Sequence, residues 1–173
     1  MTAVALVGFM GAGKTTVGRA LAARLGWPFK DLDELIQERE GQSIEHIFRA
    51  CGEARFRDTE SAVLHGLFAA ADPVPLILAL GGGAFVQVAN QKLLQQKRIP
   101  AVFLDASAEE LFRRCDQPGV QRPLRQSFDQ FSKLYDTRRP AYDNASVRIH
   151  TDSKSIPAIV DEIISTLHLG VKA

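Results

Sequence analysis

Cysteine is scarce in this chain: Cys51 and Cys115 are the only two in 173 residues, and they stand far apart. The four histidines are scattered as well, so the sequence predicts no metal cluster. No apolar run reaches the length of a membrane span, and the N-terminus has the pattern of a core strand in place of a signal peptide. A net charge of +1 gives no general attraction to nucleic acid or to an anionic membrane. We therefore expect a cytoplasmic protein that binds neither.

The rest of the composition is that of an ordinary globular protein. Apolar residues make up 46% of the chain and charged residues 24%, close to average usage. A chain of 173 residues is long enough for one sizeable core, and it contains no internal repeat or low-complexity segment. The expected organisation is one domain over residues 1–173.

A glycine-rich stretch separates a buried-strand pattern at residues 3–7 from a helical pattern at residues 17–25. Its spacing over residues 8–15, G-x-x-x-x-G-K-T, is that of a phosphate-binding loop. Such a loop points backbone N–H groups at phosphate oxygens, while Lys14 would neutralise the β- and γ-phosphates and the Thr15 hydroxyl would ligate Mg²⁺. The alternative is a glycine-rich turn with an exposed lysine. The strand before it and the helix after it favour a nucleoside triphosphate site.

Two carboxylates follow the second predicted strand, at residues 27–31. Asp31 and Asp33 flank Leu32, and in an extended chain both would lie on the same side. Ligands bind at the carboxyl ends of parallel strands. One acid can hold water on Mg²⁺ there, while the other accepts a proton or hydrogen bond from an acceptor hydroxyl. Asp33 is also a good N-cap for a helix beginning at Glu34; the two interpretations are compatible, and we favour the functional one.

Three consecutive glycines, Gly81, Gly82 and Gly83, end the strand predicted at residues 76–80. Without side chains they would let a ligand lie directly against the backbone at the carboxyl end of a strand. The alternative is a tight turn from strand to helix, for which one glycine would be enough. The triplet therefore indicates a second part of the ligand site.

Arginines occur in two further patterns whose function is open from the residues alone. Arg57 and Glu60 are three apart in a helical pattern and can pair on one face, which is most simply a surface ion pair. Residues 116–126 have no apolar period and carry Arg122 and Arg125. In a kinase such a loop could close over the nucleotide and bring an arginine to the transferring phosphoryl group. It could equally be a solvated basic loop.

Strand patterns alternate with helical patterns along the chain, which predicts a parallel sheet covered by helices on both faces. The five strands are expected at residues 3–7, 27–31, 76–80, 101–104 and 147–151. Helices are expected at residues 17–25, 34–40, from 43 to about 67, at 86–96, around 111–115, at 128–145 and at 156–169.

Several separate motifs stand in one order along the chain: G-A-G-K-T-T at 11–16, D-L-D at 31–33, F-R-x-x-E at 56–60, G-G-G at 81–83, R-P-L at 122–124 and R-x-P-x-Y at 138–142. Together they resemble the shikimate kinase family, of the nucleoside-monophosphate-kinase-like branch of phosphate-loop enzymes, over essentially the whole chain. The resemblance implies a three-layer α/β/α fold with a five-stranded parallel sheet. It also implies a mobile lid near 116–127 and an acceptor-binding helical segment near 33–62. The implied reaction is transfer of the γ-phosphoryl group of ATP to the 3-hydroxyl of shikimate, in aromatic amino acid biosynthesis, by a monomer.

The resemblance also implies roles position by position. ATP would be bound by Gly11, Ala12, Gly13, Lys14, Thr15, Thr16, Arg114, Arg122 and Ser155. Mg²⁺ would be held by Thr15 and, through water, by Asp31. The acceptor would be held by Asp33, Arg57, Gly81, Gly82, Gly83 and Arg138, with Lys14, Asp33 and Arg122 as the catalytic set. Guanidinium groups bind carboxylates bidentately. Because shikimate has a carboxylate, the resemblance favours acceptor binding by Arg57 over a surface ion pair.

Two other functions fit parts of the sequence. One is another small-molecule kinase of the same branch, for example one that acts on gluconate; the two arginines and the glycine triplet argue for shikimate. The other is a nucleotide-binding regulatory domain without catalysis. A pure binder does not need the acceptor side, so the retained set of Asp31, Asp33 and Arg122 argues against it.

Overall fold

A five-stranded sheet forms the centre of the computed structural model, which describes residues 3–69, 75–115 and 127–170. Its strands are β1 (Ala3–Val7), β2 (Phe29–Asp31), β3 (Leu76–Ala79), β4 (Ala101–Asp105) and β5 (Val147–His150). All neighbouring pairs are parallel, in the order β2-β3-β1-β4-β5. The predicted parallel sheet is confirmed, with β1 at its centre.

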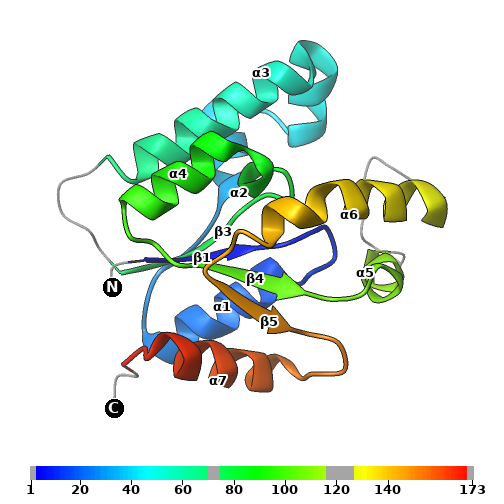
Figure 1. Ribbon diagram of the computed structural model, residues 1–173. Coiled ribbons are helices and arrows are strands. Elements are labelled where there is room, and N and C mark those ends of the chain that lie inside the picture. Colours follow the sequence, from blue (N-terminus) through cyan, green and yellow to red (C-terminus); the bar gives the residue numbers. More distant parts are fainter. Residues whose placement is uncertain (1–2, 70–74, 116–126, 171–173) are drawn as a thin grey trace.

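Helices cover both faces of this sheet (Figure 1). They are α1 (Lys14–Leu25), α2 (Leu32–Glu40), α3 (Ile44–Leu67), α4 (Val88–Gln96), α5 (Ala108–Cys115), α6 (Phe128–Tyr142) and α7 (Ile156–Leu167), with a 3₁₀ turn, η1 (Ala84–Val86), before α4. In Figure 1, α1 and α7 lie on one face, and α3, α4 and α6 lie on the other. This is the expected three-layer α/β/α arrangement.

The central strand is apolar because both of its faces are buried. Every residue of β1 is buried, and its sequence, Ala-Val-Ala-Leu-Val, is the continuous apolar run expected of a strand between two helical layers. Helix α1 packs closely on this part of the sheet. A Cβ built on Gly18 would come within 2.4 Å of the Phe29 ring and 3.2 Å of Leu6 Cδ1. The first helix thus approaches the sheet where a glycine leaves room.

The junction after β2 differs from the sequence prediction. The strand ends at Asp31 and α2 begins at Leu32, so Asp33 lies in the first helical turn. The N-cap is Asp31, whose Oδ1 accepts a hydrogen bond from the Asp33 N–H at 3.0 Å. The expectation that Asp33 caps the helix is therefore wrong, and alternation along an extended chain does not explain how the two carboxylates are placed. The cap itself turns Asp33 toward the site.

Other boundaries differ by short stretches. The region predicted as one helix from residue 86 is η1 followed by α4, and α6 ends at Tyr142, three residues before the expected end. Gly52, with φ 75° and ψ 171°, interrupts α3, so the long helix consists of two segments. The predicted lid, residues 116–127, lies outside the described residues except for Ser127, the N-cap of α6.

The close approach of α1 to the sheet predicts a difference between two helical glycines. Gly18→Ala should lower the free energy of unfolding by about 1–3 kcal/mol, because the added Cβ overlaps the Phe29 ring. Gly66→Ala, in α3 with no atom within 4 Å of the added Cβ, should leave it unchanged or raise it by up to about 1 kcal/mol. Urea unfolding of both variants measures this; equal stabilities would mean that the packing at Gly18 is loose.

Candidate active site

The loop between β1 and α1 has the backbone geometry of an anion-binding site. Gly11 and Gly13 have φ values of 81° and 84°, in the left-handed region that residues with a side chain rarely adopt. Gly11 also packs against α5, since a Cβ there would lie 2.6 Å from the Leu111 carbonyl oxygen. Helix α1 begins directly after Gly13, so its positive end faces the loop.

Two side chains at the start of α1 lie at this loop. Lys14 Nζ lies over the loop and donates to the carbonyl oxygens of Gly8 and Phe9, at 2.9 and 3.0 Å. Thr15 Oγ1 donates to Asp31 Oδ2 at 2.8 Å. A cation at the loop and two hard oxygen atoms beside it are the groups that a nucleoside triphosphate with its magnesium ion requires.

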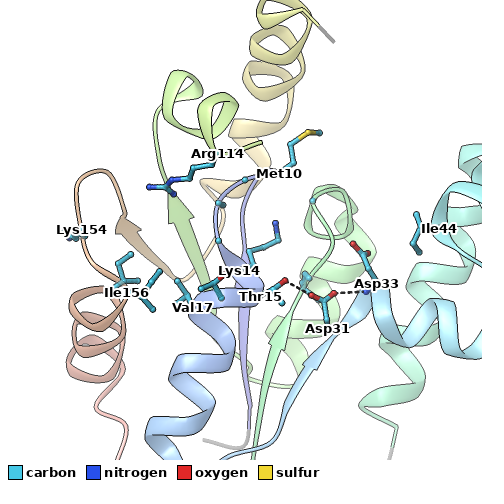
Figure 2. Close-up of a pocket in the computed structure, with 17 residues that line it drawn as sticks. Met10, Lys14, Thr15, Val17, Asp31, Asp33, Ile44, Arg114, Lys154 and Ile156 are labelled. Atoms are coloured by element: carbon cyan, nitrogen blue, oxygen red, sulfur yellow. Dashed lines mark hydrogen bonds between the residues drawn. The ribbon is translucent and has the colours of Figure 1, made fainter. Parts of the chain in front are cut away.

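A cavity of about 700 Å³ lies over this loop. Figure 2 shows Arg114, Lys154 and Ile156 toward one side of it, and Asp33 and Ile44 toward the other. The phosphate loop and the Thr15–Asp31 pair lie between them. The predicted residues that line the cavity are Gly11, Ala12, Gly13, Lys14, Thr15, Thr16, Asp31, Asp33, Gly82 and Arg114.

Arg114 is held at its side of the cavity by neighbours on two elements. Its Nε donates to Glu110 Oε1 at 2.7 Å, and its NH2 donates to the Thr151 carbonyl oxygen at 3.3 Å. Hydrogen bonds from Arg113 and Arg114 lower the pKa of Glu110 to about 2, so this carboxylate stays ionised at any working pH. Ser155 is the N-cap of α7 and accepts from the Ala158 N–H at 3.4 Å; its neighbours Lys154 and Ile156 line the cavity in its place.

The glycine triplet lies against three of the predicted acceptor residues. A Cβ on Gly81 would lie 2.6 Å from Asp33 Oδ1, and one on Gly83 would lie 2.4 Å from both terminal nitrogens of Arg57. Gly82 is less crowded, with Arg138 NH1 at 3.9 Å from such a Cβ. The glycines at Gly81 and Gly83 are therefore explained by close approach of charged side chains, which a simple turn would not require.

Arg57 and Glu60 do form an ion pair, with Arg57 NH1 2.9 Å from Glu60 Oε2, but it is not a surface pair. The Glu60 side chain is 1% exposed and that of Arg57 is 20% exposed. Burial raises the pKa of Glu60, an effect that the charge and hydrogen bond of Arg57 partly offset. The simplest interpretation of the sequence pattern is therefore wrong, since the pair points into the molecule beside the glycine turn.

Arg138 reaches the same turn from α6. Its guanidinium carbon lies 5.7 Å from the centre of the Phe9 ring, and Tyr142, one helical turn on, donates a hydrogen bond to the Gly82 carbonyl oxygen. Burial raises the pKa of Tyr142 to about 12, and Arg138 offsets part of that rise. The phenol therefore stays a hydrogen-bond donor at any working pH. The R-x-P-x-Y motif thus holds the glycine turn and an arginine together.

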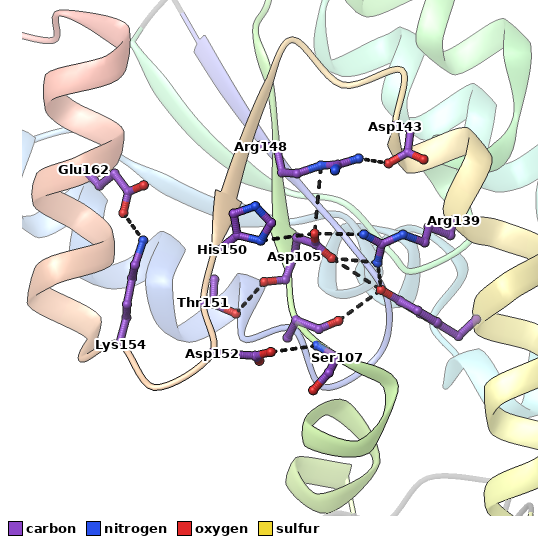
Figure 3. Close-up of polar contacts among 12 residues, drawn as sticks. Asp105, Ser107, Arg139, Asp143, Arg148, His150, Thr151, Asp152, Lys154 and Glu162 are labelled. Carbon is purple, nitrogen blue, oxygen red and sulfur yellow. Dashed lines mark hydrogen bonds and ion pairs between the residues drawn. The ribbon is translucent and has the colours of Figure 1, made fainter.

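The next arginine along α6 points elsewhere. Arg139 binds the buried Asp105 carboxylate with both terminal nitrogens, at 2.9 and 3.1 Å. Figure 3 shows Asp105, at the end of β4, surrounded by Arg139, Arg148 and His150. Bidentate pairing of a guanidinium with a carboxylate fixes orientation as well as position. Arg139 therefore ties α6 to the sheet, and Arg138 is directed toward the glycine turn.

Three residues of this region carried no recognised signal in the sequence. Asp105 resembles one more polar residue of a turn after a strand, and only the fold brings Arg139 to it. Gln87, whose Nε2 donates to Glu60 Oε2 at 2.7 Å, and Lys154 belong to no motif. Arg122, predicted to reach the phosphates, lies outside the described residues.

Comparison with known proteins gives the same assignment. A model of the shikimate kinase family matches residues 10–168. The chain belongs to the shikimate kinase family. The shikimate kinase of Geobacter sulfurreducens is 42% identical over 163 residues, which cover 92% of this chain and 87% of that protein. The shikimate kinase of Persephonella marina is 34% identical over 167 residues, 96% of this chain and 99% of that protein.

Solved structures of this family have the same fold. The shikimate kinase from Acinetobacter baumannii in complex with shikimate matches with a TM-score of 0.87 at 35% identity, covering 97% of this chain and 93% of that one. A gluconokinase from Sinorhizobium meliloti matches with a TM-score of 0.64 at 19% identity, covering 96% and 91%. The similarity to the gluconokinase shows the fold alone.

The crowding at Gly83 predicts an effect on ligand binding. In Gly83→Ala the added Cβ would displace the Arg57 guanidinium, so affinity for a carboxylate ligand should fall about tenfold or more. Calorimetry with shikimate, the ligand in the Acinetobacter baumannii structure, measures this. ATP affinity should stay within about twofold, since Arg57 does not line the cavity over the phosphate loop. Unchanged shikimate affinity would show that Arg57 does not have to occupy its position against Gly83.

Proposed function

We propose that this member of the shikimate kinase family transfers the γ-phosphoryl group of ATP to the 3-hydroxyl of shikimate, giving shikimate 3-phosphate and ADP. One observation carries the proposal. The Gly81–Gly83 turn lies against Asp33 and Arg57, approaches Arg138, and stands beside the cavity over the phosphate loop. Two arginines and a carboxylate around bare backbone suit an acceptor that has one carboxylate and several hydroxyl groups.

The loop after β1 would bind the nucleotide. Backbone N–H groups at Gly11–Thr16 and the N-terminus of α1 would hold the phosphates, and Lys14 would exchange its two carbonyl partners for phosphate oxygens. The adenine base of ATP would lie toward Arg114, whose guanidinium is fixed by Glu110 and Thr151. The predicted contact of Arg122 with the phosphates stays a prediction.

Magnesium fits the residues present. Thr15 Oγ1 and Asp31 Oδ2 are hard oxygen donors 2.8 Å apart at the edge of the phosphate site. Mg²⁺ is commonly held by one or two protein oxygens, with water and substrate phosphates completing its shell. We propose Thr15 as a direct ligand and Asp31 as a ligand through water. When bound, the ion neutralises charge on the β- and γ-phosphates.

The acceptor would bind at the glycine turn. Arg57 and Arg138 would hold its carboxylate, and the Gly82 backbone and Asp33 would contact its hydroxyls. The 3-hydroxyl oxygen attacks the γ-phosphorus, the bond from that phosphorus to the β–γ bridging oxygen breaks, and the hydroxyl proton passes to Asp33. Because Asp33 lies against Gly81 at the rim of the nucleotide cavity, one carboxylate can both orient the hydroxyl and take its proton.

We also propose that the enzyme acts as a monomer in the cytoplasm. The large apolar side chains recorded as exposed in the described part of the chain are Val88 and Phe128, too few for a stable dimer interface. Cys51 is an exposed free thiol, which suits a compartment where glutathione keeps cysteines reduced. Among the described residues, no helix has the length and hydropathy that crossing a bilayer requires.

The acceptor is tested by measuring ADP release from Mg-ATP. We expect release with shikimate and none above background with gluconate or a nucleoside monophosphate, because the chain belongs to the shikimate kinase family and shares only its fold with the gluconokinase. Release with a different acceptor alone would overturn the acceptor half of the proposal and leave the phosphate loop's role intact. Tight ATP binding with no release on any acceptor would favour a regulatory domain.

The role of Asp33 is tested by Asp33→Asn. Loss of a general base typically costs about 10²- to 10⁴-fold in rate, so kcat should fall by at least about 10²-fold while ATP affinity is retained. Glu34→Gln is the matched control: it changes the adjacent carboxylate, which is 54% exposed and paired with Arg19 at the surface, and should leave kcat unchanged. Full turnover in Asp33→Asn would remove the base from the mechanism.

A further inference from the structure

We propose that Gln87 is a positioning residue for the acceptor site: it holds the Glu60 carboxylate, which in turn directs Arg57 toward the glycine turn. The inference rests on the proposed function and adds to it a residue that belongs to none of the motifs. It predicts that Gln87 sets the affinity for the acceptor carboxylate and leaves the phosphoryl-transfer step unchanged.

The contacts form a chain across two elements. Glu60 Oε2 accepts from Arg57 NH1 at 2.9 Å and from Gln87 Nε2 at 2.7 Å. The other end of the Gln87 amide accepts from Ser61 Oγ at 3.0 Å. The orientation of the amide follows from Glu60, because a carboxylate can only accept and must therefore face the NH2 end. Gln87 lies between η1 and α4, whereas the other three residues belong to α3.

The burial of Glu60 makes the hydrogen bond from Gln87 important. Glu60 is 1% exposed, and both burial and the nearby charge of Asp33 raise its pKa. Arg57 and Gln87 are the groups whose hydrogen bonds lower it again. A buried carboxylate needs its oxygens satisfied by donors. If Gln87 is lost, Glu60 is left with a missing hydrogen bond and a stronger tendency to take up a proton.

Arg57 is bound by two carboxylates at once, so a weaker Glu60 would leave it held by the other. The same guanidinium donates through NH2 and Nε to Glu53 Oε1, at 3.1 and 3.4 Å, and the Glu53 side chain is 66% exposed. Glu60 draws Arg57 inward against Gly83, and Glu53 draws it toward solvent. Gln87 therefore favours the inward position, in which Arg57 can meet an acceptor carboxylate.

A substitution of the Gln87 side chain should not disturb the end of η1 or the start of α4. It follows η1 and precedes α4, and its side chain makes no capping hydrogen bond to α4. The chain also supplies a matched control one helical turn later. Gln91 is 9% exposed; its Nε2 donates to the Phe85 carbonyl oxygen at 2.7 Å and its Oε1 accepts from Asn144 Nδ2 at 3.2 Å. Among the described residues it makes no hydrogen bond to Glu60 or Arg57.

The experiment compares Gln87→Leu with Gln91→Leu. For Gln87→Leu we expect the KM for shikimate to rise about tenfold, the size of effect for a lost hydrogen bond to a charged group. Its kcat and its KM for ATP should stay within about twofold of the unchanged enzyme, because no atom of the phosphate site is altered. Gln91→Leu should unfold at lower urea concentration and keep the KM for shikimate. Equal KM values in the two variants, or a fall in kcat alone for Gln87→Leu, would overturn the proposal.

Action through Glu60 is tested by a double-mutant cycle with Glu60→Gln. If Gln87 acts through Glu60, Gln87→Leu should have at most a twofold effect on the KM for shikimate in the Glu60→Gln background. The same cycle measured by urea unfolding, without any ligand, should show that the two substitutions are not additive. Additive effects in that ligand-free cycle would overturn the inference. Absence of turnover with shikimate in the unchanged enzyme would instead overturn the proposed function, and the unfolding cycle would still decide whether Gln87 is coupled to Glu60.

Discussion

The proposed acceptor half of this site depends on charged side chains packing against backbone that has no side chains of its own. Asp33 and Arg57 each lie where a Cβ on Gly81 or Gly83 would overlap them. Asp33 on α2 and Arg57 on α3 therefore lie against a single turn at the carboxyl end of β3. Because the carboxylate and the guanidinium both lie against that turn, the end of β3 is the common surface on which they are placed.

The nucleotide half follows the same logic at the neighbouring strand. β1 ends in the phosphate loop and pairs with β3, which ends in the glycine turn, so the proposed positions of the two substrates lie at the ends of adjacent parallel strands. Asp31, at the end of β2, links the halves, because one carboxylate oxygen meets Thr15 and the other caps the helix that carries Asp33. The two substrates are thus brought together by strand order, and the connecting contact is a helix cap.

The sequence was sufficient for the parts of the molecule that local rules determine. Continuous apolar runs predicted β1, β3 and β4, because a strand covered on both faces must be largely apolar, and the partly exposed β5 followed from its alternation. It failed at Asp33, where the competition between extended and helical backbone was decided by the Asp31 cap. It also missed the roles of Asp105 and Gln87, since their partners Arg139 and Glu60 stand 34 and 27 residues away and are brought to them by the fold. Polar pairs between distant segments leave no period in a sequence.

Helix α6 carries two adjacent arginines that point to different places. Arg138 lies near Gly82, and Arg139 binds Asp105. Arg139 is bound at two points to a buried carboxylate on β4, so α6 cannot rotate toward a ligand without breaking that pair. Helix α3, which carries Arg57, is interrupted by the positive φ of Gly52. The interruption lies before the helical segment to which Arg57 belongs. The α6 side of the proposed acceptor site is therefore anchored to the sheet, while α3 is interrupted at Gly52, before the segment that carries Arg57. Helix α6 thus supplies the fixed side of the site.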